Sequence, residues 1–280
     1  MTETLLLPFR FPFMWDAFLM AAIIAVPTAL LSCFLVLKGW ALMGDAVSHA
    51  VLPGIVLAYI LGFPLILGAF GAGMITTLAT GFLAENSRVK QDTVMGVVFS
   101  GMFGLGMVMF SVITSDMHLD HILFGNLLGV GAQDLWTAGL IGLVVSAGLL
   151  LKWRDLMLYA FDPAQARASG LAVGFLHYGL LTALSLSIVA TLTATGLILA
   201  IGLLIGPGAI AFLLVRSFGR MLVVAVLACL TSTLGGVYLS FFLDSSPAAT
   251  IVLILTAIFV MAFLRRTRQI RRANAIAEPG

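Results

Sequence analysis

Two ionisable residues, Asp45 and His49, stand four positions apart in a stretch that is otherwise long and apolar enough to cross a bilayer. Four residues are about one helical turn, so both side chains leave nearly the same face of a helix. An ionisable group inside a membrane helix costs roughly 2.5–3.5 kcal/mol on insertion scales, so it rarely persists without a partner, a cavity or a ligand. A carboxylate and an imidazole on one face make half of a site for a divalent metal.

A third candidate ligand, His177, lies at a similar depth in another apolar stretch and would join the pair if the two helices pack together. Carboxylate oxygen and imidazole nitrogen suit Mn²⁺, Fe²⁺ or Zn²⁺, whereas Cu(I) favours thiolates. We therefore predict a metal site of Asp45, His49 and His177 whose shell is completed by water. Two simpler roles stay open. Asp45 and His49 could serve only to anchor helix packing, and His177 could be an interfacial histidine whose ring nitrogens are hydrogen-bonded to a neighbour.

The composition indicates which solvent surrounds these residues. Hydrophobic residues make up 61% of the 280 positions and charged residues 9%, too few for a surface that faces water. Most apolar stretches are roughly 20 residues long, which suits a helix that spans a hydrocarbon core of ~30 Å. We predict an all-α integral membrane protein embedded in the lipid bilayer, since a membrane β-barrel would show short alternating segments. The net charge of +2 indicates no nucleic-acid partner.

About nine (eight to nine) transmembrane helices account for the chain. The nine ranges are 15–37, 43–61, 63–84, 93–113, 133–151, 171–192, 196–215, 221–242 and 249–264. If the C-terminus is cytoplasmic, Arg10 is the only Lys or Arg residue on the outer side, in agreement with the positive-inside rule. This orientation places the N-terminus outside. Residues 1–264 then form a single transmembrane domain, and 265–280 form a basic cytoplasmic tail.

The loop after the fifth span predicts a short cytoplasmic helix over 162–171. Asp162 suits its N-cap, Pro163 its first position and Gly170 its end, with Arg167 near its last turn. The chain has no G-x-x-x-x-G-K-[ST] loop to cradle ATP phosphates, so any ATPase that drives it must be another polypeptide. The predicted helix is a candidate docking surface for that partner, and an ordinary connector helix is the alternative.

The string G-D-A-V-S-H-A-V-L-P-G at 44–54 resembles the signature of the permease subunits of bacterial ATP-binding-cassette importers for manganese, zinc or iron. Weaker similarities lie at 120–126, 162–171 and 200–214, and the resemblance runs from about residue 15 to 264. It implies a second permease copy, two cytoplasmic ATPase subunits and an external metal-binding protein. It also implies a place in the bacterial cytoplasmic (inner) membrane, with 162–171 as the helix that couples to the ATPase.

The resulting expectation is a transporter permease without enzymatic activity of its own, which passes a divalent metal and binds no permanent cofactor. A proton-coupled metal carrier is one alternative, although intramembrane acids that could relay protons are scarce. A membrane-embedded metallohydrolase is another, but no glutamate within a span offers a general base. A further group on the predicted external side could receive metal or simply be solvated: Asp116, His118, Asp120 and His121.

Overall fold

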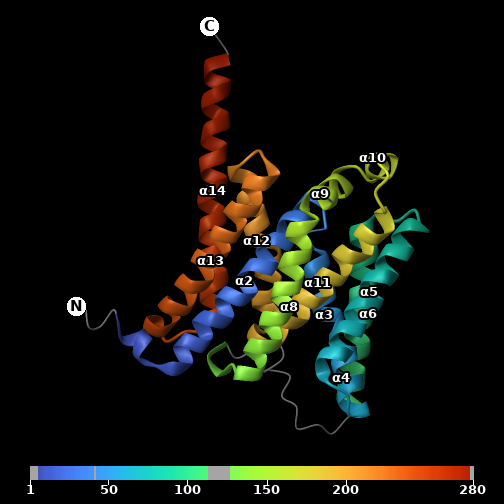
Figure 1. Cartoon of the computed structure of the whole chain (residues 1–280), viewed down its shortest axis with the longest axis vertical. Coiled ribbons are helices and arrows are strands. Elements are labelled where there is room, and N and C mark those ends of the chain that lie inside the picture. The colour runs from blue at the N-terminus through green and yellow to red at the C-terminus, as the bar shows by residue number, and fades with distance from the viewer. Residues whose placement is uncertain (1–5, 41, 113–126, 278–280) are drawn as a thin grey trace.

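The computed structural model describes residues 6–40, 42–112 and 127–277, and all regular secondary structure in these ranges is helical. Nine helical stretches there are long and apolar enough to cross a membrane, which confirms the predicted architecture and number of spans. Figure 1 shows them as one bundle of inclined helices, with α14 protruding beyond the others. The boundaries agree with the prediction to within a few residues at most ends, and the last span is the exception.

Helix α2, Pro12–Lys38, follows the short 3₁₀ helix η1, Leu7–Arg10, and forms the centre of the bundle. It contacts α8, α11, α12 and α13, and most of the side chains in its second half are fully buried. The helix ends at Gly39, whose φ of 74° lies in the left-handed region that glycine adopts without strain. Lys38 is therefore held at the last position of a buried helix.

The second span is interrupted. Helix α3, Met43–Ala50, ends directly after His49, and α4, Leu52–Leu61, begins on the far side of Val51. Pro53 lacks the N–H that would continue the hydrogen-bond ladder of α3, which explains the break. Asp45 thus lies in the first turn and His49 in the last turn of a short half-helix.

Helices α5, Leu65–Glu85, and α6, Gln91–Val112, pack against this interrupted span. The backbones of α4 and α5 touch at Gly54 and Gly68, where a β-carbon on either glycine would overlap the other's carbonyl group. On α6, a β-carbon at Gly106 would lie 2.9 Å from the Pro53 nitrogen. Small residues therefore let the three helices approach at backbone distance.

The middle of the chain crosses the bundle twice, with two short helices between the crossings. These elements are η2, Leu127–Gly129; α8, Ala132–Leu151; α9, Trp153–Phe161; α10, Pro163–Ala168; and α11, Val173–Thr195. Helices α9 and α10 lie at one end of the bundle, between α8 and α11 (Figure 1). The sequence predicts α10 but not α9.

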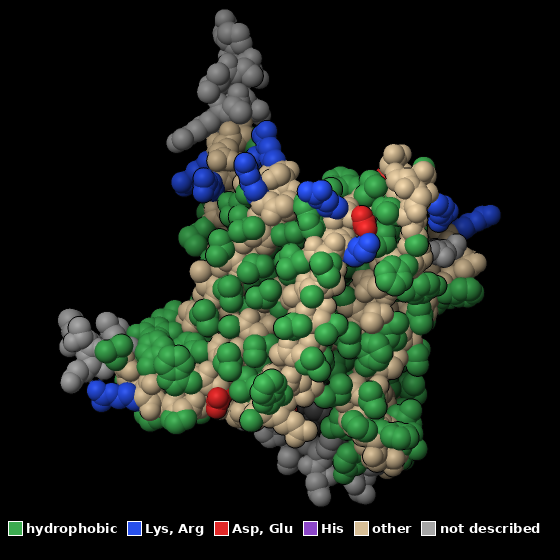
Figure 2. Space-filling view, viewed as in Figure 1, with side chains coloured by type: hydrophobic (Ala, Val, Ile, Leu, Met, Phe, Trp, Pro, Cys, Tyr) green, Lys and Arg blue, Asp and Glu red, His purple; other side chains and the backbone are tan. Residues whose placement is uncertain are grey.

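Helices α12, Leu197–Leu214, and α13, Phe218–Leu243, continue the bundle, and α14, Pro247–Ala277, closes the described chain. Helix α12 passes through Pro207 without ending, and Gly208 lies so close to the Ser32 carbonyl of α2 that no side chain would fit between them. Helix α14 continues through residue 264 without a break, so the start of the basic tail is an extension of the last span. Lys and Arg side chains gather at the end of the molecule from which α14 protrudes (Figure 2).

Candidate functional site

Asp45 and His49 face the same side of α3, as their spacing predicts. His49 Nε2 lies 3.9 Å from Asp45 Oδ1, too far for a direct hydrogen bond. The two side chains remain 28% and 38% exposed for His49 and Asp45, respectively, although α3 packs against α5, α6, α11 and α12. The pair therefore borders an open space and does not form a closed contact within the bundle.

Aromatic side chains of α6 hold the His49 ring. Its centroid lies 5.7 Å from that of Phe99 and 5.4 Å from that of Phe103. His49 Nδ1 is buried and has no hydrogen-bond partner in the described part of the chain. With Nδ1 turned inward, Nε2 is the ring nitrogen on the side of Asp45, which leaves it as the atom that can reach an ion beside that carboxylate.

Neighbouring small residues fix the position of α3. The Ser48 hydroxyl donates a 2.7 Å hydrogen bond to the Gly44 carbonyl, so Ser48 is satisfied within its own helix. A β-carbon at Gly44 would lie 3.2 Å from the Leu204 side chain of α12. Gly44 thus allows the helix that carries Asp45 to pack closely on α12.

His177 does not join this pair. In the described ranges, no three His, Cys, Asp or Glu residues lie close enough together to hold a metal ion. His177 faces α9 instead, where its Nδ1 lies 2.7 Å from the Tyr159 hydroxyl, and its ring meets Trp40 edge to face at 5.7 Å. The predicted meeting of all three residues is therefore absent from this conformation, because His177 is turned toward α9 and the end of α2.

A cavity of about 570 Å³ opens beside His177. Its lining includes Lys38, Thr77 of α5 and Arg167 of α10 as well as His177. The Lys38 ammonium lies 4.0 Å from the ring centre of Tyr159 and donates a 3.4 Å hydrogen bond to the Tyr159 carbonyl. Two cationic side chains, Lys38 and Arg167, thus border the cavity, which lies between α10 and the ends of α2, α5 and α11.

Helix α10 has the boundaries that its sequence predicts. Asp162 Oδ1 accepts hydrogen bonds from the Ala164 and Gln165 N–H groups at 2.9 and 3.0 Å, which satisfies the first turn. Gly170 has a φ of 79° and donates to the Arg167 carbonyl, and the following N–H bonds back to Ala166, which closes the helix in a Schellman motif. Ala166 is fully buried and Arg167 is exposed, so one face of α10 packs inward and the other is available for contact.

One predicted group lies outside the described residues, and two structural features were not predicted. The external group Asp116, His118, Asp120 and His121 lies outside the described residues. Helix α9 and the contact between Tyr159 and His177 are structural features that sequence reasoning missed. The signal for α9 was the spacing of Leu156, Tyr159 and Ala160, which places three buried residues on one helical face.

An ionisable pair inside an interrupted span of a helical membrane bundle is the arrangement expected of a membrane transport protein. Asp45 and His49 lie in the half of this span that precedes the break. The fold and the Asp45–His49 pair therefore define a membrane transport protein.

The chain belongs to the ABC 3 transport family, which it matches over residues 10–266. It is 56% identical over 261 residues to the chelated iron transport system membrane protein YfeD of Yersinia pestis, covering 92% of this chain and 86% of that protein. It is 44% identical over 257 residues to the manganese transport system membrane protein MntB of Synechocystis sp. (strain ATCC 27184 / PCC 6803 / Kazusa), covering 92% and 84%, respectively. In the solved structure of PsaBC from Streptococcus pneumoniae in complex with Fab, one chain aligns with a TM-score of 0.84 and 31% identity, covering 94% of this chain and 95% of that chain.

The chain is thus a multi-pass membrane permease of a bacterial ABC transport system and not itself an enzyme. Membership of such a system implies an ATPase and a binding protein as partners. The family also sets aside the membrane metallohydrolase and the proton-coupled carrier as functions of this chain.

Proposed function

We propose that this permease passes Mn²⁺ or Fe²⁺ from an external metal-binding protein to the cytoplasm, with Asp45 and His49 as ligands along the way. The relatives support the choice of ion, since one is named for chelated iron transport and another for manganese transport. The donor atoms of Asp45 and His49 are consistent with these ions, because carboxylate oxygen suits Mn²⁺ and imidazole nitrogen suits Fe²⁺. Zn²⁺ accepts the same donors, so the experiment below includes it.

The separation of the two donor atoms is the observation that carries the proposal. Ligands at about 2.0–2.2 Å from a shared ion can lie up to about 4.2 Å apart. The 3.9 Å between His49 Nε2 and Asp45 Oδ1 falls within that limit, and it exceeds hydrogen-bonding distance. A pair that served only to anchor packing would instead be expected to close into a hydrogen bond.

The partial exposure of Asp45 and His49 supports a position for both residues on the transport pathway. A carboxylate in contact with lipid would be strongly unfavourable, so the 38% exposed Asp45 side chain must face water or protein in the membrane. A second permease copy packed along this side would enclose the space and form the other wall of the pathway. Water would complete the ligand shell, and two protein ligands hold an ion weakly enough for release.

We propose an orientation with the N-terminus outside and the C-terminus in the cytoplasm of the bacterial inner membrane. The clustering of cationic side chains at the end from which α14 protrudes supports it through the positive-inside rule (Figure 2). Helix α10 would then face the cytoplasm and dock into an ATPase subunit, one for each permease copy. Its exposed Arg167 and its firmly capped ends suit a rigid contact.

We propose that His177 is not a metal ligand in this conformation. Its cavity also carries Lys38 and Arg167, and two cations disfavour a divalent metal ion at the same place. The same cavity borders α10, so His177 is better suited to positioning the docking helix than to binding the ion.

The experiment measures the metal bound to the assembled permease–ATPase complex after separate equilibration with Mn²⁺, Fe²⁺ and Zn²⁺, followed by uptake in proteoliposomes. Asp45→Asn and His49→Gln remove one ligand each and should lower both bound metal and uptake more than about tenfold. Asp155→Asn and His177→Gln make the same chemical changes elsewhere and should retain the bound metal. Unchanged binding and uptake in a folded Asp45→Asn, His49→Gln double variant would overturn the site assignment.

A further inference from the structure

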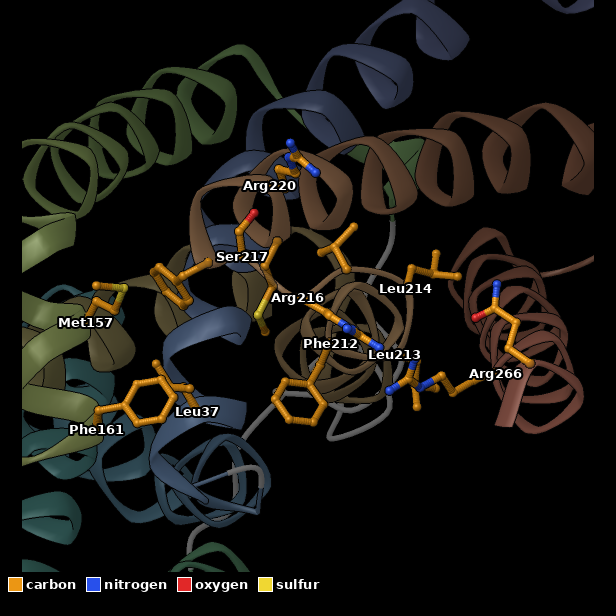
Figure 3. Close-up of a pocket in the computed structure, with 14 residues that line it drawn as sticks. Leu37, Met157, Phe161, Phe212, Leu213, Leu214, Arg216, Ser217, Arg220 and Arg266 are labelled. Carbon is orange, nitrogen blue, oxygen red and sulfur yellow. The ribbon is translucent and has the colours of Figure 1, made fainter. Parts of the chain in front are cut away.

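A second cavity, of about 800 Å³, lies where α12 turns into α13, beside the C-terminal part of α14 (Figure 3). Of the described residues that line it, only Phe161 also lines the cavity beside His177. The docking helix and the metal pair contribute nothing to its wall. This cavity is therefore separate from the site described above.

Three arginines line the cavity: Arg216 between α12 and α13, Arg220 in the first turn of α13, and Arg266 of α14. The guanidinium groups of Arg216 and Arg266 point toward each other although they come from different elements (Figure 3). No lining residue is acidic, and within the described ranges neither Arg216 nor Arg266 forms an ion pair with a carboxylate. Two cations directed at one space repel each other unless an anion lies between them.

Most of the remaining wall is apolar. It includes Leu37, Phe212, Leu214, Phe218 and Met221. Phe212 is 57% exposed, although it lies in α12, one of the candidate membrane spans. Arg266 lies on α14 just beyond the end of its apolar stretch, where the arginines begin. The occupant must therefore present an anion to the arginines and an apolar portion to the membrane-spanning helices below them.

We propose that this cavity binds an anionic phospholipid of the leaflet on the α14 side of the bundle. The lipid phosphate lies between Arg216 and Arg266, where guanidinium groups provide charge-assisted hydrogen bonds. The Ser217 hydroxyl, which also lines the cavity, is a further donor. An acyl chain then follows Phe212 and Leu214 along α12.

The combination of charge and apolar wall favours a lipid over other anions. Inorganic phosphate would satisfy the arginines and leave the apolar wall uncovered. A soluble ATPase would meet the arginines from the aqueous side but would not reach residues inside the spans. Basic pockets between membrane helices bind lipid headgroups for this reason. The bound lipid would tie α14 to the turn between α12 and α13.

The test is native mass spectrometry of the purified permease–ATPase complex titrated with phosphatidylglycerol, with phosphatidylcholine as the zwitterionic comparison. The double variant Arg216→Gln, Arg266→Gln should bind phosphatidylglycerol roughly ten- to thirtyfold more weakly. Arg271→Gln is the matched control, because it removes the same charge from the same helix outside the cavity. That control should bind phosphatidylglycerol as the parent does.

Three outcomes would overturn the proposal. The first is equal affinity of the parent for phosphatidylglycerol and phosphatidylcholine, and the second is displacement of the lipid by millimolar inorganic phosphate. The third is unchanged lipid binding in the double variant together with loss of the ATPase subunits, which would assign the arginines to the ATPase interface. A double variant that dissociates during purification would be replaced by the single variant Arg266→Gln, for which the same loss of selectivity is expected.

Discussion

The Tyr159 hydroxyl and His177 Nδ1 lie 2.7 Å apart, and this hydrogen bond joins α9 to α11 across the two ends of the segment that contains α10. Lys38 adds a third element, because its ammonium group packs on the Tyr159 ring from the end of α2. Helix α10 is therefore tied at both flanks to membrane-spanning helices. A displacement of α10 would be transmitted to α11 and α2 through these contacts.

Tyr159→Phe removes the hydroxyl and should leave the metal bound at Asp45 and His49 unchanged. The loss of a partly buried hydrogen bond is expected to lower stability by about 1 kcal/mol and to raise the ATP hydrolysed per ion transported. The measurement is the ratio of ATP hydrolysis to metal uptake in proteoliposomes. Tyr178→Phe is the control, since it removes a phenolic hydroxyl beside the same histidine. An unchanged ratio in Tyr159→Phe would argue against a role of this contact in coupling.

His177→Gln should resemble Tyr159→Phe in this assay and differ from His49→Gln. The reason is that His177 faces α9, whereas His49 lies beside Asp45. The comparison is made by measuring bound Mn²⁺ and the coupling ratio on the same preparations. Loss of bound metal in His177→Gln, with Tyr159→Phe unaffected, would return His177 to the ligand set.

Asp162→Ala should weaken the association of the permease with its ATPase. The substitution removes the acceptor of two N–H groups at the start of α10 and costs about 1 kcal/mol of helix stability. Co-purification of the ATPase subunits measures the effect. Asp162→Asn keeps a capping oxygen without the negative charge. If the helix cap is the property that supports docking, this variant should still associate with the ATPase. Full association of Asp162→Ala and of Arg167→Ala would exclude α10 as the docking element.

Gly54→Ala should destabilise the permease because its β-carbon would overlap the Gly68 backbone. Over-packing of a close contact costs typically 1–3 kcal/mol, which thermal unfolding in detergent would detect. Gly71→Ala is the control on the neighbouring helix, where no atom lies within 4 Å of the added carbon. Equal melting temperatures for the two variants would contradict the close approach of α4 and α5.

Local sequence signals predict the parts of the structure that local physics determines. The spans follow from apolar length, the ends of α10 follow from Asp162 and Gly170, and the shared face of Asp45 and His49 follows from helical spacing. The orientation of His177 was not predictable in this way. The depth of His177 within its span can be counted along the sequence. The direction of its side chain depends on the rotation of α11 relative to α9, which long-range packing determines.

Helix α9 and the extension of α14 were missed for a related reason. Nine residues with Arg154 and Asp155 among them do not resemble a span, and only burial of one face against the bundle makes them an ordered helix. The arginines after residue 264 indicate the edge of the membrane, yet nothing in them interrupts a helix, so α14 continues.

The glycine contact between α4 and α5 has a mechanical consequence. With no side chains between Gly54 and Gly68, the backbones of α4 and α5 are in direct contact, so neither helix can move toward the other without a backbone clash. Asp45 and His49 lie on the other side of the break at Val51, on the half-helix that packs against α6 and α12. The break at Val51 therefore lies between this backbone contact and the half of the span that carries Asp45 and His49.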